Sequence, residues 1–245
     1  MKADLNVKLI SHTMNPEEII AVAGKLCYSP SSIEDLTSKQ TEETINKFIN
    51  MLVSIGHESP LEHCVFNFAI EGVSRSLTHQ LVRHRIASYS QQSQRYVKEG
   101  DNFKFIVPQV ISDMGKEAEY EKDMKLIHLM YQKWQENIKD FVEDNNYPTN
   151  GMNAEKVANE NARYVLPNAC ETKIICTMNL RTLINFCHHR CCRRAQDEIH
   201  KLAWAMVKEI EKVSPLLARS LGASCQFGPC PEGKMCCGRP FTKVS

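Results

Sequence analysis

The longest periodic segment of the sequence, residues 114–143, is the feature that most limits the possible folds. Its apolar residues recur every three to four positions and form one broad stripe, which predicts a single long helix with one buried face. Shorter helical patterns are spread over the rest of the chain, at 17–28, 75–85, 152–164, 181–190 and 195–213. Alternating apolar and polar residues, which are typical of half-buried strands, occupy 5–10, 65–70 and 173–178. Helices and strands that alternate along one chain predict an α/β (α+β) fold with a central sheet flanked by helices.

The chain shows no internal repeat and no linker that would force a domain boundary. Its 245 residues are enough to bury a sizeable core. We therefore predict a single domain over residues 1–221, followed by an irregular tail over 222–245 in which Gly, Pro and Cys dominate.

The sequence predicts a cytoplasmic protein that does not enter a membrane. No stretch approaches the roughly 18 to 20 apolar residues of a membrane span. The apolar run at the N-terminus is too short for a signal peptide. The 11 cysteines are an odd number in a long chain, whereas secreted disulfide scaffolds are short and carry an even number. We therefore expect reduced thiols in a reducing compartment.

The formal net charge of +1 argues against a strongly basic nucleic-acid coat, but it hides a local imbalance. Residues 72–97 and 172–196 contain no Asp or Glu. The arginines of these two windows are Arg75, Arg83, Arg85, Arg95, Arg181, Arg190, Arg193 and Arg194. Guanidinium groups bind phosphates with a planar, two-pronged geometry. The windows therefore predict a site for phosphorylated ligands, built from two separate segments; the alternative is a pair of solvated helix faces.

A run of polar residues within the first window, residues 88–96, is predicted to form an irregular segment. Its hydroxyl and carboxamide groups offer both donors and acceptors, as needed to contact a nucleobase edge or to surround a phosphate. Taken alone, the same run could be an exposed loop.

The first window contains a cluster of basic residues with a fixed spacing to a serine. Arg83-His84-Arg85, followed after seven residues by Ser93, resembles the signature motif of the flavin-dependent thymidylate synthase family. Further matching segments are His57–His63, Ala162–Pro167, Asn179–Asn185 and Arg190 with Ala195-Gln196. Order and spacing agree from about residue 5 to residue 215, which is nearly the whole chain.

The resemblance implies a homotetramer whose active sites are shared between subunits. It implies that each site binds FAD, and that the reaction is the reductive methylation of dUMP to dTMP without an enzyme nucleophile. Methylenetetrahydrofolate would be the carbon donor, and NADPH would reduce the flavin. The implied partners are other copies of the chain and small molecules, with no nucleic acid and no membrane.

The resemblance also assigns roles to residues. It implies that Arg190 is the catalytic group, placed against the uracil to favour its N3-deprotonated form. The positions that match dUMP-binding residues are Gln80, Arg83, Gln91, Gln92, Ser93, Gln94, Arg95, Arg163 and Arg190. The positions that match FAD-binding residues are Ser59, Arg83, His84, Arg85, Gln91, Asn179, Leu180, Arg181 and Asn185. No metal-binding residue is expected.

One departure from the family concerns Arg194, because better-known members carry a His near the flavin ring at this position. The tail leaves several interpretations open, since its cysteines are spaced C-x4-C-x5-C-C, without the C-x2-C pair typical of zinc sites. They could be free thiols, a disulfide formed under oxidation, or metal ligands. Cys64 and Cys176, in or beside predicted strands, are expected to be core residues.

An alternative from another class of protein uses the same features. The two basic windows could bind RNA or single-stranded nucleic acid, with the tail as a zinc-binding module. The near-zero net charge and the aromatic content of 7% argue against a stacking surface for bases. The flavoenzyme is therefore the preferred interpretation.

Overall fold

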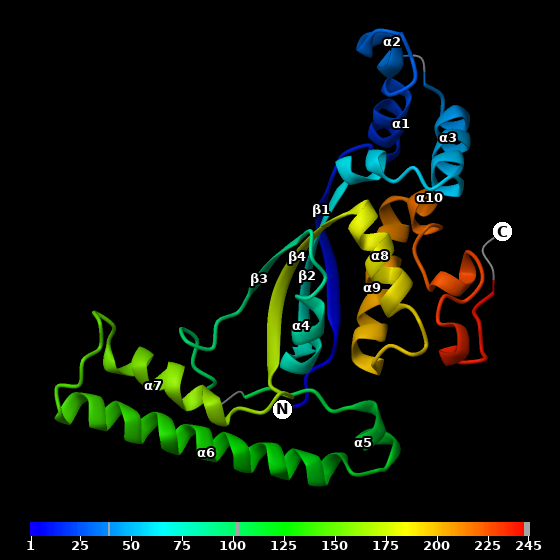
Figure 1. The fold of residues 1–245 in the computed structure, drawn as a ribbon. Coiled ribbons are helices and arrows are strands. Elements are labelled where there is room, and N and C mark those ends of the chain that lie inside the picture. Colours follow the sequence, from blue (N-terminus) through cyan, green and yellow to red (C-terminus); the bar gives the residue numbers. More distant parts are fainter. Residues whose placement is uncertain (39, 101–102, 243–245) are drawn as a thin grey trace. The chain divides into compact units, whose positions relative to one another are not determined.

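One sheet organises the computed structural model, which describes residues 1–38, 40–100 and 103–242. Within these residues the sheet has four strands in the order β1-β2-β4-β3 (Figure 1). The strands are β1 (Asn6–His12), β2 (Val65–Ser74), β3 (Ala87–Gln91) and β4 (Glu171–Asn179). The prediction of a fold that mixes helices with a sheet is confirmed.

The two central strands follow from their sequence patterns. In β2, Phe66, Phe68 and Ile70 are buried and alternate with more exposed residues. In β4 the buried residues again occupy every second position, among them Ile174 and Cys176. Successive side chains of a strand point to opposite faces, so each pattern gives the sheet one apolar face.

Strand β3 corrects the prediction of an irregular segment over residues 88–96. Ala87–Gln91 forms a strand at the edge of the sheet, beside β4. Its residues are alternately half-buried and exposed, but the side chains are mostly polar. The pattern that identifies strands relies on alternating hydrophobicity, and an edge strand of Ser, Tyr and Gln residues does not show it.

The described chain divides into two compact units, and parts of the strands belong to each. The first unit comprises Met1–Asn6, Glu71–His79 and Ser90–Ile174. The second comprises Val7–Ile70, Gln80–Tyr89 and the described residues from Ile175 onward. Nothing in the sequence marks these boundaries, because each unit is assembled from segments far apart along the chain.

The first unit contains the long helix predicted from residues 114–143. Its helices are α5 (Gln109–Asp113), α6 (Glu117–Asp144), α7 (Ala154–Ala162), the short 3-10 helix η2 (Arg163–Val165) and the first turns of α4 (Arg75–Leu81). Helices α6 and α7 lie side by side (Figure 1). Tyr131 of α6 is fully buried, and Nε2 of Gln135 donates a buried hydrogen bond of 2.6 Å to Oδ1 of Asn159.

Only one stripe of α6 is buried, and a second apolar stripe on the same helix is exposed. The exposed large side chains of this helix are Leu126, Leu129, Met130, Trp134 and Phe141. Trp134 keeps 50% of its surface exposed. Contiguous exposed apolar side chains are typical of surfaces that are covered by a partner.

The second unit holds most of the remaining helices. They are α1 (Pro16–Leu26), α2 (Ile33–Ser38), α3 (Glu42–Ser54), η1 (Ser59–His63), α8 (Leu180–Arg190), α9 (Asp197–Val213), α10 (Pro215–Ala218), η3 (Ser224–Gln226) and η4 (Gly233–Met235). Helix α9 buries Leu202, Met206 and Ile210 along one face. None of the helices in the described part of the chain is both long and apolar enough to cross a lipid bilayer.

Candidate active site

A cleft of about 420 Å³ lies in the second unit. The residues that line it are Glu58, Glu62, Arg85, Ile86, Asn179, Arg181, Thr182, Ile184, Asn185 and His188. Four predicted FAD-binding residues, namely Arg85, Asn179, Arg181 and Asn185, are therefore brought together. The volume falls in the range of about 300 to 1,000 Å³ that is usual for ligand sites.

The N-terminus of α8 forms one wall of the cleft. Asn179 caps the helix, because its Oδ1 accepts a hydrogen bond of 2.9 Å from the backbone N–H of Thr182. Oγ1 of Thr182 donates to the carbonyl of Ile86 at 3.3 Å. Ile86 has a φ of +65°, an uncommon conformation for a β-branched residue, and its side chain is 81% exposed. Strained backbone of this kind gathers at functional sites.

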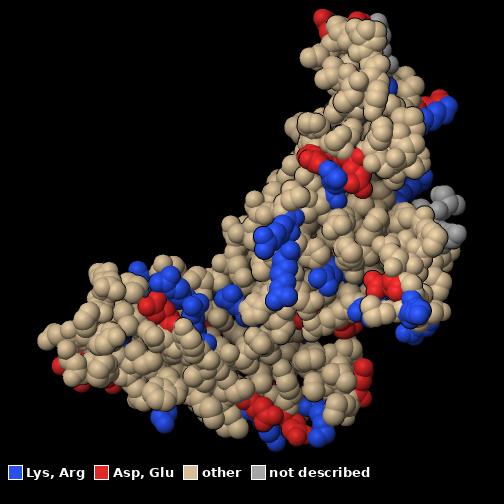
Figure 2. Space-filling view, in the orientation of Figure 1, with Lys and Arg blue, Asp and Glu red and all other residues tan. Residues whose placement is uncertain are grey.

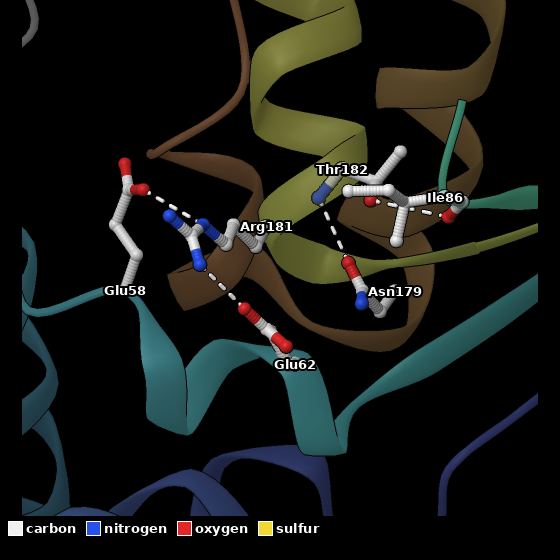
Figure 3. Close-up of polar contacts among 6 residues, drawn as sticks. All are labelled: Glu58, Glu62, Ile86, Asn179, Arg181 and Thr182. Atoms are coloured by element: carbon white, nitrogen blue, oxygen red, sulfur yellow. Dashed lines mark hydrogen bonds and ion pairs between the residues drawn. The ribbon is translucent and has the colours of Figure 1, made fainter. Parts of the chain in front are cut away.

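Arg181 occupies the cleft between two carboxylates that were absent from the predicted site (Figure 3). Its Nε donates to Glu58 at 2.9 Å and its Nη1 to Glu62 at 2.5 Å. Both carboxylates come from the His57–His63 segment, which carried the family resemblance without any role for its acids. The ion pairs hold the guanidinium group in place although all three side chains are substantially exposed.

Arg190, the predicted catalytic residue, is held by His84. Its Nε–H donates to Nε2 of His84 at 3.0 Å. Because a guanidinium group only donates, this nitrogen of His84 accepts and the ring proton lies on Nδ1. Burial, followed by the charges of Arg190 and His189, lowers the pKa of His84 to about 4. His84 is therefore neutral at pH 7 and orients the guanidinium group, and it packs edge-on against Phe186 at 4.9 Å.

The low pKa of His84 makes the stability of the protein depend on pH. Unfolded His84 takes up a proton near pH 6.5, but the folded form does so only near pH 4. The contribution of neutral His84 to the free energy of unfolding is therefore complete above pH 6.5 and is lost as the pH falls toward 4. A shift of this size corresponds to about 3 kcal/mol, which solvent screening of this half-exposed group reduces to about 1–2 kcal/mol.

When the pH is lowered from 7 to 4.5, we expect the free energy of unfolding to fall by about 1–2 kcal/mol less in His84→Gln than in the wild type. The side-chain carbonyl of Gln still accepts a hydrogen bond from Arg190 but does not titrate. Urea unfolding at the two pH values measures the difference. His63→Gln, at an exposed position in η1, should follow the wild type. An equal acid loss in wild type and His84→Gln would contradict the assignment.

The other predicted residues of the second unit lie outside the lining of this cleft. Leu180 is fully buried, and its N–H donates to the carbonyl of Cys64 at 2.8 Å, so its side chain is part of the core. Gln80 donates from Nε2 to Oε1 of Gln196. Ser59 and Arg83 are exposed.

The first unit holds the remaining predicted residues, Gln91 to Arg95 and Arg163. Gln91 is anchored by two hydroxyl groups, because its Nε2 donates to Thr78 at 3.0 Å and to Thr172 at 3.3 Å. Gln94 donates from Nε2 to Sγ of Cys170 at 3.3 Å. Oγ of Ser93 accepts the backbone N–H of Arg95 at 3.2 Å, which curls the segment after β3.

Two predicted dUMP-binding arginines meet at Glu160. Arg95 forms an ion pair of 2.8 Å with its carboxylate, and Nε of Arg163 donates to its carbonyl at 3.3 Å. The structure thus gathers two guanidinium groups beside the polar segment Gln91–Arg95. Figure 2 shows that some basic side chains lie beside acidic ones, as such pairs require, while others on this face lie among uncharged side chains.

Arg75 is a candidate site residue that the predicted set omitted. Its Nη2 donates to the carbonyl of Gln92 at 3.0 Å. Its Nε is buried and has no hydrogen-bond partner among the described residues. An unsatisfied buried donor is costly unless a ligand or water completes it. The only signal in the sequence was that Arg75 stands in the first acid-free window.

The cysteines divide into core and tail groups. Cys64 and Cys176 are fully buried, which confirms their prediction as core residues. Burial raises the pKa of each thiol to about 12. All 11 cysteines carry free thiols. Within the described ranges, no group of three or more His, Cys, Asp or Glu side chains could hold a metal ion.

Guanidinium, amide and hydroxyl groups, which can bind phosphorylated ligands, are present in each of the two units. Comparison with known families specifies the class of protein. Residues 8–216 match the family described as thymidylate synthase complementing protein, and the chain belongs to this family.

Its relatives bear the name that the sequence motifs indicated. A flavin-dependent thymidylate synthase from Clostridium tetani is 54% identical over 239 residues, which cover 96% of this chain and 94% of the relative. One from Geobacter sulfurreducens is 44% identical over 236 residues, with coverages of 96% and 94%. The predicted resemblance is therefore confirmed.

A solved structure supports the fold. A UMP/dUMP methylase, PolB from Streptomyces cacaoi, bound with 5-Br dUMP, superimposes with a TM-score of 0.71. It is 20% identical, and the match covers 89% of this chain and 95% of that protein.

Proposed function

We propose that this protein catalyses the reductive methylation of dUMP to dTMP, with methylenetetrahydrofolate as carbon donor and with FAD that NADPH reduces. Membership of a family whose named relatives are flavin-dependent thymidylate synthases supports the proposal. The observation that carries it in the structure is the cleft, because four residues matched to flavin binding line it together.

The residues of the cleft fit FAD. Arg85 offers a guanidinium group to a phosphate. Arg181, whose ion pairs with Glu58 and Glu62 use Nε and Nη1, offers its Nη2 group as well. Asn185 offers an amide to hydrogen-bonding edges of the ligand, and the N-terminus of α8 favours negative charge. When bound, FAD supplies the redox chemistry of the reaction.

For dUMP we propose Arg190 as the group that stabilises negative charge on the pyrimidine ring. A fixed cation at this place makes C5 nucleophilic without a covalent enzyme adduct. Arg95, Arg163 and the polar segment from Gln91 to Gln94 would bind the nucleotide. Ser93 would act as a binding and activating hydroxyl group, and the unsatisfied Nε of Arg75 adds a donor beside Gln92.

We also propose that the protein assembles as a homotetramer with shared active sites. The exposed apolar stripe of α6 supports assembly, since its large side chains would be covered by another copy. The proposal further assigns catalysis to the domain over residues 1–221, with 222–245 as an appended tail, and places the protein in the cytoplasm. Residues 243–245 of that tail lie outside the described residues.

One assay tests the function directly. The purified protein should be yellow, dUMP should perturb its flavin spectrum, and a mixture with dUMP, methylenetetrahydrofolate and NADPH should form dTMP. Omission of any one of the three should stop product formation. A colourless protein that cannot be reconstituted with FAD would overturn the proposal.

A further inference from the structure

A short loop of the tail, Cys230–Cys236, holds Arg194. The Nη1 group of Arg194 donates to the carboxylate of Glu232 at 2.8 Å and to the carbonyl of Met235 at 2.7 Å. Both acceptors lie inside the loop, and both of its ends are cysteines. The loop and Arg194 line one cavity of the second unit.

The backbone of the loop turns just before its second cysteine. It turns through η4. There the N–H of Met235 donates to the backbone carbonyl of Glu232 at 2.9 Å, and the N–H of Cys236 donates to the backbone carbonyl of Gly233 at 3.1 Å. Gly233 takes a φ of +52°, which favours glycine at this point of the turn. Cys230 and Cys236 line the same cavity, and their thiols interact with each other.

The two thiols are unequal. The backbone N–H of Gly238 donates to Sγ of Cys236 at 3.5 Å. This bond, then the interaction with the Cys230 thiol, and more weakly the charge of Arg194, lower the pKa of Cys236. Cys236 is also exposed. Its thiolate is thus the natural nucleophile, and the Cys230 thiol interacts with it.

We propose that Cys230 and Cys236 form a reversible disulfide that closes the loop around the contacts with Arg194. With oxidised glutathione as the oxidant, the Cys236 thiolate attacks one glutathione sulfur and releases glutathione thiolate. The Cys230 thiolate then attacks Sγ of Cys236, which forms the protein disulfide and releases the second glutathione. The two cysteines lose two electrons and two protons in total, and oxidised glutathione gains them as two reduced molecules.

A second pair of interacting cysteines differs from the tail pair in its burial. Cys187 and Cys191, at the end of α8, also interact with each other, but both are fully buried. Burial is the main reason that the pKa of Cys187 is raised well above its usual value. A buried thiol without thiolate character reacts slowly with a dissolved oxidant. The Cys187–Cys191 pair is therefore an internal control.

The test is a thiol and mass analysis of the full chain after equilibration with oxidised glutathione. We expect the tail to lose two free thiols and two hydrogens, apart from any mixed disulfide at the exposed Cys27. Trypsin cuts after Lys234, inside the loop, so the two resulting peptides should stay linked until a reductant is added. Cys230→Ser and Cys236→Ser should each lose this link completely, whereas Cys225→Ser and Cys237→Ser should keep it.

The result does not depend on dTMP synthesis, because it is read from mass and thiol titre. Arg194→Ala should still form the link but should slow alkylation of Cys236, since one cation near the thiolate is lost. A link at another pair, or a tail that stays fully reduced in oxidised glutathione while the exposed Cys27 forms a mixed disulfide, would overturn the proposal.

Discussion

We expect Arg190→Ala to keep its bound flavin and to lose turnover by about 10²–10³-fold, the usual cost of removing a group that stabilises developing charge. In the structure, Nε of Arg190 is fixed by His84, so the side chain is oriented before any ligand arrives. Pre-oriented charge requires no reorganisation during the reaction, which is why its loss affects kcat more than KM.

The flavin spectrum and steady-state kinetics of the same preparation separate the two effects. Arg219→Ala, which removes an exposed arginine of the second unit, is the matched control and should retain wild-type turnover. Full activity in Arg190→Ala would refute the proposed role. Loss of flavin together with activity would instead assign Arg190 to cofactor binding.

The largest effect on stability is expected for Gly72→Ala, at about 3 kcal/mol or more, the sum of left-handed strain and overpacking. Gly72 has a φ of +68°, and a Cβ atom there would lie 1.8 Å from the carbonyl oxygen of Asp4. The obstacle is backbone, so a change of side-chain rotamer cannot relieve it. Denaturant unfolding at pH 7 measures the loss.

Gly56→Ala separates the cost of backbone strain at positive φ from the cost of a steric clash. Gly56 has a similar φ of +73°, but a Cβ atom there would meet nothing within 4 Å. We expect it to cost about 1 kcal/mol, the strain alone. Equal losses in the two variants would show that the approach of Asp4 to Gly72 is not rigid.

The elements that the sequence predicted best are those with a strong hydrophobic period. Helix α6 and strands β2 and β4 were found within a few residues of their ends, because buried side chains recur on one face of each. Strand β3 was missed, since a polar edge strand has no such pattern. The division into two units was equally invisible, because sequence patterns are local and the units join distant segments.

The candidate site was predicted as a set of residue types rather than as a set of contacts. The two acid-free windows and the family motifs found the arginines, but the acids that pair with Arg181 lie more than a hundred residues away in the sequence. The bond between Arg190 and His84 spans 106 positions. Such partners follow from tertiary packing, so only the structure identifies them.

The cleft lined by Arg181 has a consequence for how ligands reach it. Its two arginines, Arg85 and Arg181, are balanced by Glu58 and Glu62, so these four side chains carry no net formal charge. A balanced site exerts little attraction on an anion beyond about one Debye length. Long-range attraction therefore adds little to the rate at which anions reach the cleft. Discrimination between ligands therefore depends on the neighbouring amide and hydroxyl groups, which contact the ligand directly.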